Sequence, residues 1–141
     1  MKPFLLFFMF LAFTPLAVAQ QGDVQINDLR VSQPIPGQTM SAGYFQITNH
    51  SDRVLTLIGV EANIAERVEL HQSMNMNGMN HMRPLQSAHI QPGETLVFEP
   101  GGRHLMLIGV QATQAENLTP ELTFRFTDGS ELIVQAQWVK W

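Results

Sequence analysis

After an apolar start, the chain alternates short hydrophobic runs with turn-forming residues. Within Gly43–Thr48, for example, Phe45 and Ile47 alternate with Tyr44, Gln46 and Thr48. A period of two is typical of a half-buried β-strand. Comparable runs, separated by Gly, Pro and Asn, predict strands at residues 24–31, 43–48, 54–60, 67–71, 94–99, 103–110, 121–127 and 131–139. Short strands at this spacing favour an antiparallel sandwich or a small barrel.

The connections between these runs carry weaker signals. Asp128-Gly129 separates the last two runs, and Asp-Gly between apolar runs predicts a two-residue hairpin turn. One short helix is expected over Glu61–Glu66. The stretch 111–119 has no clear period and is interpreted as an irregular crossover.

The first nineteen residues have the pattern of an export signal. Lys2 precedes an apolar run over residues 4–13, and Ala17-Val18-Ala19 offers a small-x-small cleavage site. This pattern predicts a signal peptide, Met1–Ala19, that is removed on export. A membrane anchor is the alternative, but the apolar run is too short to span a bilayer. We therefore expect one exported domain, Gln20–Trp141, located outside the cytoplasm.

Composition narrows the class of protein. The chain has 141 residues, of which 45% are hydrophobic and 14% charged, which suits a single well-cored domain. The net charge is −4, so the composition does not indicate the basic surface that nucleic-acid binding requires. There is no cysteine, so disulfides, a cysteine-linked lipid anchor, Cys-ligated zinc, iron–sulfur clusters and the thiolate of a blue-copper site are excluded.

Methionine and histidine are unevenly placed and mark the candidate chemistry. His104 and Met106 are two residues apart, so on a strand both side chains lie on one face. Met106 alone could be core packing, because methionine often fills gaps. Methionines among Asn, Ser and Gly are poorly explained by packing. Twelve consecutive positions, 71–82, hold six methionine and histidine residues: His71, Met74, Met76, Met79, His81 and Met82.

Imidazole and thioether ligands together point to a soft metal ion. Both ligands are neutral, and thioethers prefer Cu(I) to Zn(II), Ca(II) or Mg(II). Thioethers also persist in an oxidising compartment, where thiols form disulfides. The cluster therefore predicts a copper site. Met74, Met76, Met79 and His81 could form a capture loop, shield the metal or hold a second ion, or they could belong to a mobile polar loop.

The spacing of four of these residues resembles a known family. His71, ten residues, Met82, twenty-one residues, then His104-Leu105-Met106 is similar to the H-x10-M-x21-H-x-M pattern of PCu(A)C-type periplasmic copper chaperones. The segments 42–49, 65–71 and 100–109 also resemble that family. The resemblance implies a single-domain, cupredoxin-like Greek-key β-sandwich or barrel. It also implies one Cu(I) bound by His71, Met82, His104 and Met106.

The same resemblance implies a function and partners. Copper would be delivered to the copper centre of a haem–copper (cytochrome c) oxidase or to a partner assembly chaperone, by a monomer that is not an enzyme. Some relatives also hold Cu(II) at a secondary site in a C-terminal extension. A copper sequestration or resistance protein without a dedicated acceptor is the alternative, and a metal-free sandwich module is a third hypothesis.

Overall fold

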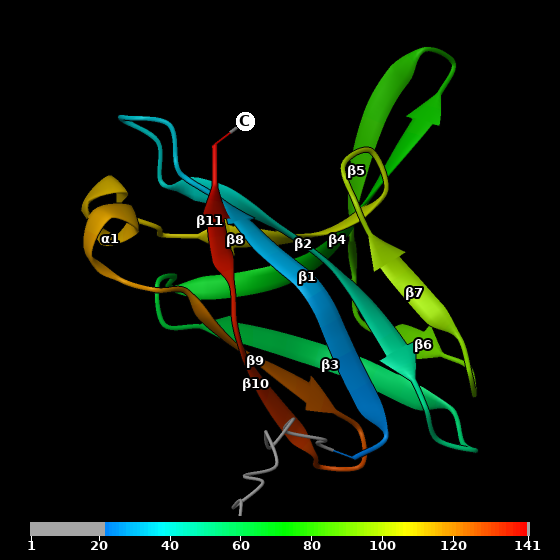
Figure 1. Cartoon of the computed structure of the whole chain (residues 1–141). Coiled ribbons are helices and arrows are strands. Elements are labelled where there is room, and N and C mark those ends of the chain that lie inside the picture. Colours follow the sequence, from blue (N-terminus) through cyan, green and yellow to red (C-terminus); the bar gives the residue numbers. More distant parts are fainter. Residues whose placement is uncertain (1–21, 141) are drawn as a thin grey trace, which may run out of the picture.

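The computed structural model describes residues 22–140 and consists of two packed β-sheets (Figure 1). The larger sheet has the order β11 (Gln137–Val139), β1 (Val24–Ser32), β2 (Met40–Asn49), β8 (Arg103–Ile108), β4 (Arg67–Met76) and β5 (Met79–Leu85), and β7 (Thr95–Phe98) also pairs with β2. The smaller sheet has the order β10 (Glu131–Gln135), β9 (Glu121–Phe126), β3 (Leu55–Ala62) and β6 (Ala88–Ile90). The all-β, single-domain prediction is confirmed, and the sheets form an open sandwich rather than a closed barrel.

The hydrophobic core lies between the two sheets. Alternate residues of most strands point inward, and Phe45 of β2 stacks on Phe98 of β7 with ring centroids 4.3 Å apart. Phe124 of the smaller sheet meets Phe45 edge-on at 5.1 Å. Leu105 and Leu107 of β8 are fully buried in the same core. This alternation leaves the intervening residues of β8 on the outer face of the larger sheet.

The helix predicted over Glu61–Glu66 is wrong. Glu61 and Ala62 continue β3 and pair with Thr123 and Leu122 of β9, so tertiary pairing overrides the weak local signal. A segment this short has little helical stability of its own to oppose that pairing. A short helix, α1 (Ala112–Asn117), instead lies in the stretch interpreted as an irregular crossover.

The last predicted strand, residues 131–139, is divided between the two sheets. Ala136 separates β10 from β11, is buried, and donates its N–H to the Pro120 carbonyl at 2.8 Å. The hairpin predicted at Asp128-Gly129 is confirmed, but its loop spans Thr127–Gly129, because the Phe126 N–H bonds to the Ser130 carbonyl at 3.0 Å. Gly129 has φ of 83°, the left-handed conformation that closes a three-residue loop.

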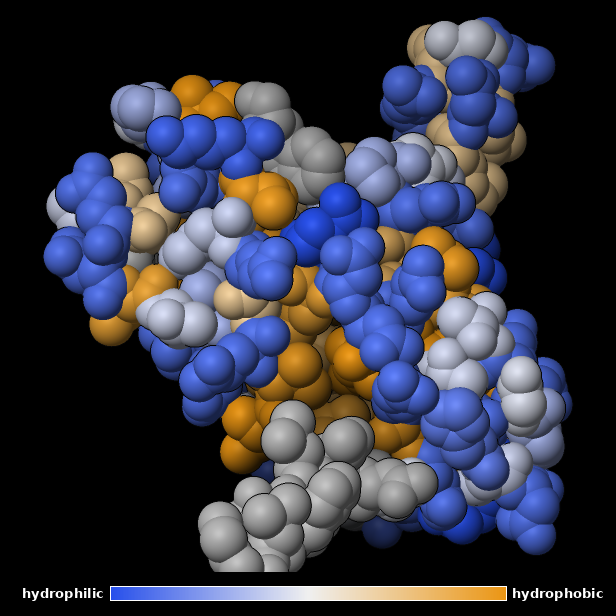
Figure 2. Space-filling view, in the orientation of Figure 1, coloured by the Kyte–Doolittle hydropathy of each residue, from blue (hydrophilic) through white to orange (hydrophobic). Residues whose placement is uncertain are grey.

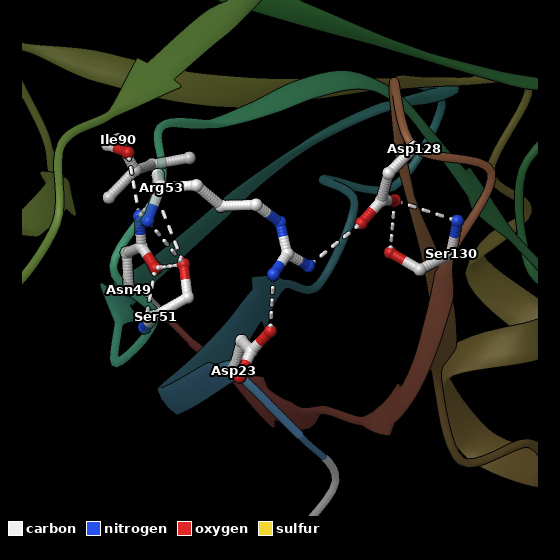
Figure 3. A network of polar contacts seen from close by, with 7 residues as sticks. All are labelled: Asp23, Asn49, Ser51, Arg53, Ile90, Asp128 and Ser130. Carbon is white, nitrogen blue, oxygen red and sulfur yellow. Dashed lines mark hydrogen bonds and ion pairs between the residues drawn. The ribbon is translucent and has the colours of Figure 1, made fainter.

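A polar network ties three surface segments together at the end of the sandwich that holds the β9–β10 turn (Figure 3). Arg53 forms ion pairs with Asp23 at 3.0 Å and Asp128 at 3.4 Å. Asn49 is buried and donates to the carbonyls of Arg53 and Ile90. Bonds from Ser130 and the Arg53 ion pair hold the pKa of the Asp128 carboxyl below its usual value. The network therefore fixes the start of β1 and two loops.

The export signal and the membrane-anchor alternative are the remaining expectations. The predicted signal peptide, Met1–Ala19, lies outside the described residues. Within residues 22–140, helices long and apolar enough to cross a bilayer are not found.

Candidate metal site

Residues 72–82, for which the sequence allows a capture loop or a mobile polar loop, form part of a regular β-hairpin. His71 was expected to end a strand, but β4 continues five residues further, to Met76, and β5 begins at Met79. Asn77 and Gly78 form the turn with φ of 54° and 79°, as a type I′ turn requires. The resulting ribbon stands clear of the sandwich (Figure 1). Pro84 is tolerated in β5 because β5 is an edge strand.

His71 and His104 face each other across the β4–β8 ladder. They are register partners, and their ring centroids are 5.9 Å apart. Their neighbours Leu70 and Leu105 are also partners and are buried in the core. Both imidazoles therefore lie on the outer face of the larger sheet. Their side chains are nonetheless shielded, with His71 9% and His104 6% exposed.

The two methionines lie on the same outer face. Met106 follows His104 at two residues and stands opposite Glu69 of β4 and Ala42 of β2. Met82 of β5 stands opposite Ser73, which is two residues from His71 on β4. Same-face neighbours are separated by about 5 Å across a ladder and about 7 Å along a strand. The structure thus brings all four predicted ligands onto one face of three adjoining strands.

A pocket of about 390 Å³ opens over this face, and Met82, His104 and Met106 line it. His71 is not among its lining residues, but lies beside His104. Met82 is 54% exposed. Sequence reasoning missed Ile35, Met40 and Tyr44, which also line the pocket. Burial raises the pKa of the Tyr44 phenol above its usual value.

Hydrogen bonds set which nitrogen of each imidazole carries a lone pair. His104 Nδ1 lies 3.1 Å from the Gly102 carbonyl, which only accepts, so Nδ1 donates and Nε2 keeps its lone pair. His71 Nε2 lies 2.8 Å from a Glu69 carboxylate oxygen and donates to it. His71 Nδ1 therefore carries the lone pair, and this atom is buried with no hydrogen-bond partner.

Glu69 supports His71 from the same strand. Its second oxygen accepts a bond from Arg67 Nε at 2.9 Å. The bond from His71, followed by that from Arg67, lowers the pKa of the Glu69 carboxyl. The structure therefore places Glu69 in direct contact with His71 rather than free in solvent. A carboxylate on the far nitrogen of an imidazole fixes the ring and raises its basicity toward a metal.

The turn before β8 holds the other side of the site. The Gly102 carbonyl accepts from the Ser73 N–H at 3.0 Å as well as from His104. Gly101 has φ of 80°, a conformation that favours glycine. One backbone oxygen thus joins the turn, β4 and a candidate ligand.

Donors for hard divalent ions are not grouped in the part of the chain that the structure describes. Three or more His, Asp or Glu side chains placed to hold an ion do not occur there. The outer face offers two imidazole nitrogens and two thioether sulfurs instead. This donor set is soft and neutral, and it suits a monovalent soft ion.

The chain belongs to the LpqE-like family, described as putative lipoprotein LpqE-like, whose pattern it matches over residues 24–138. It is 30% identical over 118 residues to a protein named "Putative lipoprotein Lxx21020" from Leifsonia xyli, covering 81% of this chain and 71% of that protein. It is also 29% identical over 98 residues to "Uncharacterized protein RP573" from Rickettsia prowazekii, covering 69% of this chain and 54% of that protein.

Solved structures share the fold. The copper-bound PCuAC domain from PmoF2 superposes with a TM-score of 0.68 at 21% identity, covering 84% of this chain and 94% of that domain. The solution structure of apo-DR1885 from Deinococcus radiodurans has a TM-score of 0.64 at 27% identity, covering 99% of this chain and 97% of that one. CuI-DR1885 has a TM-score of 0.57 at 28% identity, covering 86% and 82%. The cupredoxin-like prediction is therefore confirmed.

Proposed function

We propose that this protein is an exported copper chaperone that binds one Cu(I) through His71, Met82, His104 and Met106. One observation carries the proposal: His71 Nδ1 is buried and unpartnered beside His104. A buried polar atom without a partner costs stability, and a metal bond to its lone pair would satisfy it. The copper named for the PmoF2 domain and DR1885 structures supports this choice of ion.

The geometry of the imidazole pair fits a shared ion. Two imidazoles bound to one metal at about 2.0 Å place their ring centroids roughly 5 to 6 Å apart. The centroids of His71 and His104 are 5.9 Å apart. Met82 and Met106 would add sulfur from two sides, through flexible side chains. A shell of four neutral ligands favours Cu(I) over Cu(II), because it supplies no negative charge to offset the higher charge of Cu(II).

Release to a partner would begin at the exposed rim. Met82 is 54% exposed on an edge strand, whereas both histidines are shielded. An incoming ligand from an acceptor protein can replace the Met82 sulfur first, while the imidazoles still hold the ion. Ligand exchange of this kind moves copper without free Cu(I) in solution. The site therefore suits transfer better than permanent storage.

The acceptor and the compartment follow the expectations drawn from the sequence. We propose that Met1–Ala19 is cleaved on export, that residues 20–141 act as a monomer in the periplasm, and that the acceptor is a haem–copper oxidase subunit or its assembly chaperone. A fixed shell of soft neutral ligands is poorly suited to redox cycling, so we propose a carrier rather than an enzyme.

Two experiments test this function. Anaerobic titration of the protein against a coloured Cu(I) chelator should give one tight site that is lost in His71→Ala combined with Met106→Leu. Retention of tight binding by that double variant would contradict the ligand set. Deleting the gene should reduce oxidase activity in copper-poor medium. Copper sensitivity with normal oxidase activity would indicate a sequestration protein instead.

A further inference from the structure

The β4–β5 ribbon carries a second group of soft donors beyond the proposed chaperone site. In the ladder, Met74 pairs with His81, and Met76 pairs with Met79. Directly opposed residues lie on one face of a sheet, as do residues two apart on a strand. Met74, Met76, Met79 and His81 therefore share one face of the ribbon as two adjacent rungs.

The tip of the ribbon fixes this arrangement. Asn77-Gly78 closes a two-residue turn, and the Gly78 N–H donates to Asn75 Oδ1 at 3.1 Å. Register in such a hairpin is set by the turn. The four side chains begin at the corners of a rectangle about 5 Å across the ladder and about 7 Å along the strands. Three thioethers and an imidazole can reach a common point above it.

This group lies on the opposite face of the ribbon from Met82. Met82 pairs with Ser73, and the rung of Met74 and His81 is the next one along, so its side chains point the other way. The opposite placement of the two groups argues against the interpretation that these methionines shield an ion bound by Met82. Their donors form a set that shares no residue with the outer-face site.

Core packing does not explain the outer members of this group. Met76 and Met79 are 52% and 62% exposed, Met74 is half-buried, and the ribbon projects from the body of the molecule (Figure 2). Below the two rungs the same face continues with Gln72 opposite Arg83, then Leu70 opposite Leu85. These rungs hold no carboxylate, and a nearby guanidinium disfavours divalent cations. A neutral set of three sulfurs and one nitrogen is selective for soft monovalent ions.

We propose that Met74, Met76, Met79 and His81 form a second, solvent-exposed binding site for a soft monovalent cation, Cu(I) in its native setting. The site does not depend on the outer-face ligands. Because it stands at the projecting end of the ribbon, it binds more weakly and exchanges faster than a site built on shielded imidazoles. It gives the protein a capacity of two ions.

The test uses Ag(I), a soft monovalent ion that does not change oxidation state under the assay conditions. Isothermal titration should give two ions per wild-type chain and one in Met76→Leu/Met79→Leu. Ile133→Leu is the control, because Ile133 is 58% exposed on β10 of the smaller sheet, away from both groups of donors. It should keep both ions. Circular dichroism confirms that each variant is folded.

A second measurement assigns the ions. A second sample contains methyl-labelled methionine in His71→Ala/Met106→Leu, a variant that retains only the ribbon site. Adding Ag(I) to this variant should shift the methyl NMR signals of Met76 and Met79. One ion in wild type, unchanged in Met76→Leu/Met79→Leu, would overturn the ribbon site and leave the proposed chaperone site intact. Two ions in wild type with both retained in Met76→Leu/Met79→Leu would also overturn it. If His71→Ala/Met106→Leu loses the tighter ion and keeps the weaker one, the result supports two separate sites.

Discussion

His71 and His104 are direct partners across the β4–β8 ladder, with ring centroids 5.9 Å apart, although 32 residues separate them in the sequence. Each ring has one nitrogen engaged by a nearby oxygen. The other nitrogen of each ring is left with its lone pair. This relationship gives the outer face of the larger sheet two preorganised candidate donors.

Replacing either thioether should weaken Cu(I) binding without unfolding the protein. Met82→Leu and Met106→Leu keep the size and apolar character of the side chain but remove the sulfur. We expect the Cu(I) affinity to fall at least tenfold, which corresponds to about 1.4 kcal/mol, in a chelator competition assay. Met40 lines the same pocket and lies outside the ligand set, so Met40→Leu should bind like wild type. An equal loss in Met40→Leu would argue against the assignment.

Glu69 should act through His71. Glu69→Gln removes the charged acceptor of the His71 Nε2–H bond, and loss of such a partner typically costs about 10- to 100-fold in metal affinity. Nitrogen NMR of the His71 ring should show a mixture of tautomers in this variant. Arg67→Gln, which changes only the other oxygen's partner, should leave the His71 tautomer unchanged. A Glu69→Gln protein with one His71 tautomer and normal affinity would refute this role.

Gly109 should be required at the end of β8. It has φ of 81°, and a Cβ there would lie 2.5 Å from Glu66 Cγ. Gly109→Ala should lower the free energy of unfolding by about 1 to 3 kcal/mol, measured by urea denaturation. Gly37 has φ of 84° with open space around it, so Gly37→Ala reports the backbone strain alone. Equal losses in the two variants would show that the Glu66 contact has no effect.

Asp128 should stabilise the fold in a pH-dependent way. Because its pKa is lowered in the folded protein, its contribution is complete above the pKa of the unfolded carboxyl, about 3.9, and disappears as pH falls through the folded pKa. Asp128→Asn should therefore be less stable than wild type at pH 7, and the difference should shrink below pH 4. Asp52→Asn, at an exposed position in a neighbouring loop, is the control. A difference independent of pH would contradict the prediction.

Local patterns predicted most of the strands, but not β5 or β6, and they predicted the shared face of one pair of candidate ligands. Phe45 and Ile47 alternate with polar neighbours, and His104 and Met106 share a face because they are two residues apart. Both relations lie within a single strand. The family resemblance, rather than the pattern, supplied the full set of four proposed ligands, and the structure places these four residues on one face.

The remaining features depend on pairing between distant strands. Glu61 and Ala62 are in a strand because β9 pairs with them, and the opposition of His71 and His104 depends on β4 lying beside β8. The β4–β5 ribbon is different, because the residues that indicate it are neighbours in the sequence. Asn77-Gly78 between two runs predicts a two-residue hairpin turn, and from that turn the shared face of Met74, Met76, Met79 and His81 could have been inferred.

The most direct test of the central claim is X-ray absorption at the copper edge of protein loaded with one equivalent of Cu(I). Met76→Leu/Met79→Leu should be used, so that the ribbon site does not contribute. The account predicts nitrogen and sulfur scatterers in equal number, at about 2.0 and about 2.3 Å. A copper environment of nitrogen or oxygen alone, or one unchanged by adding Met106→Leu, would contradict it.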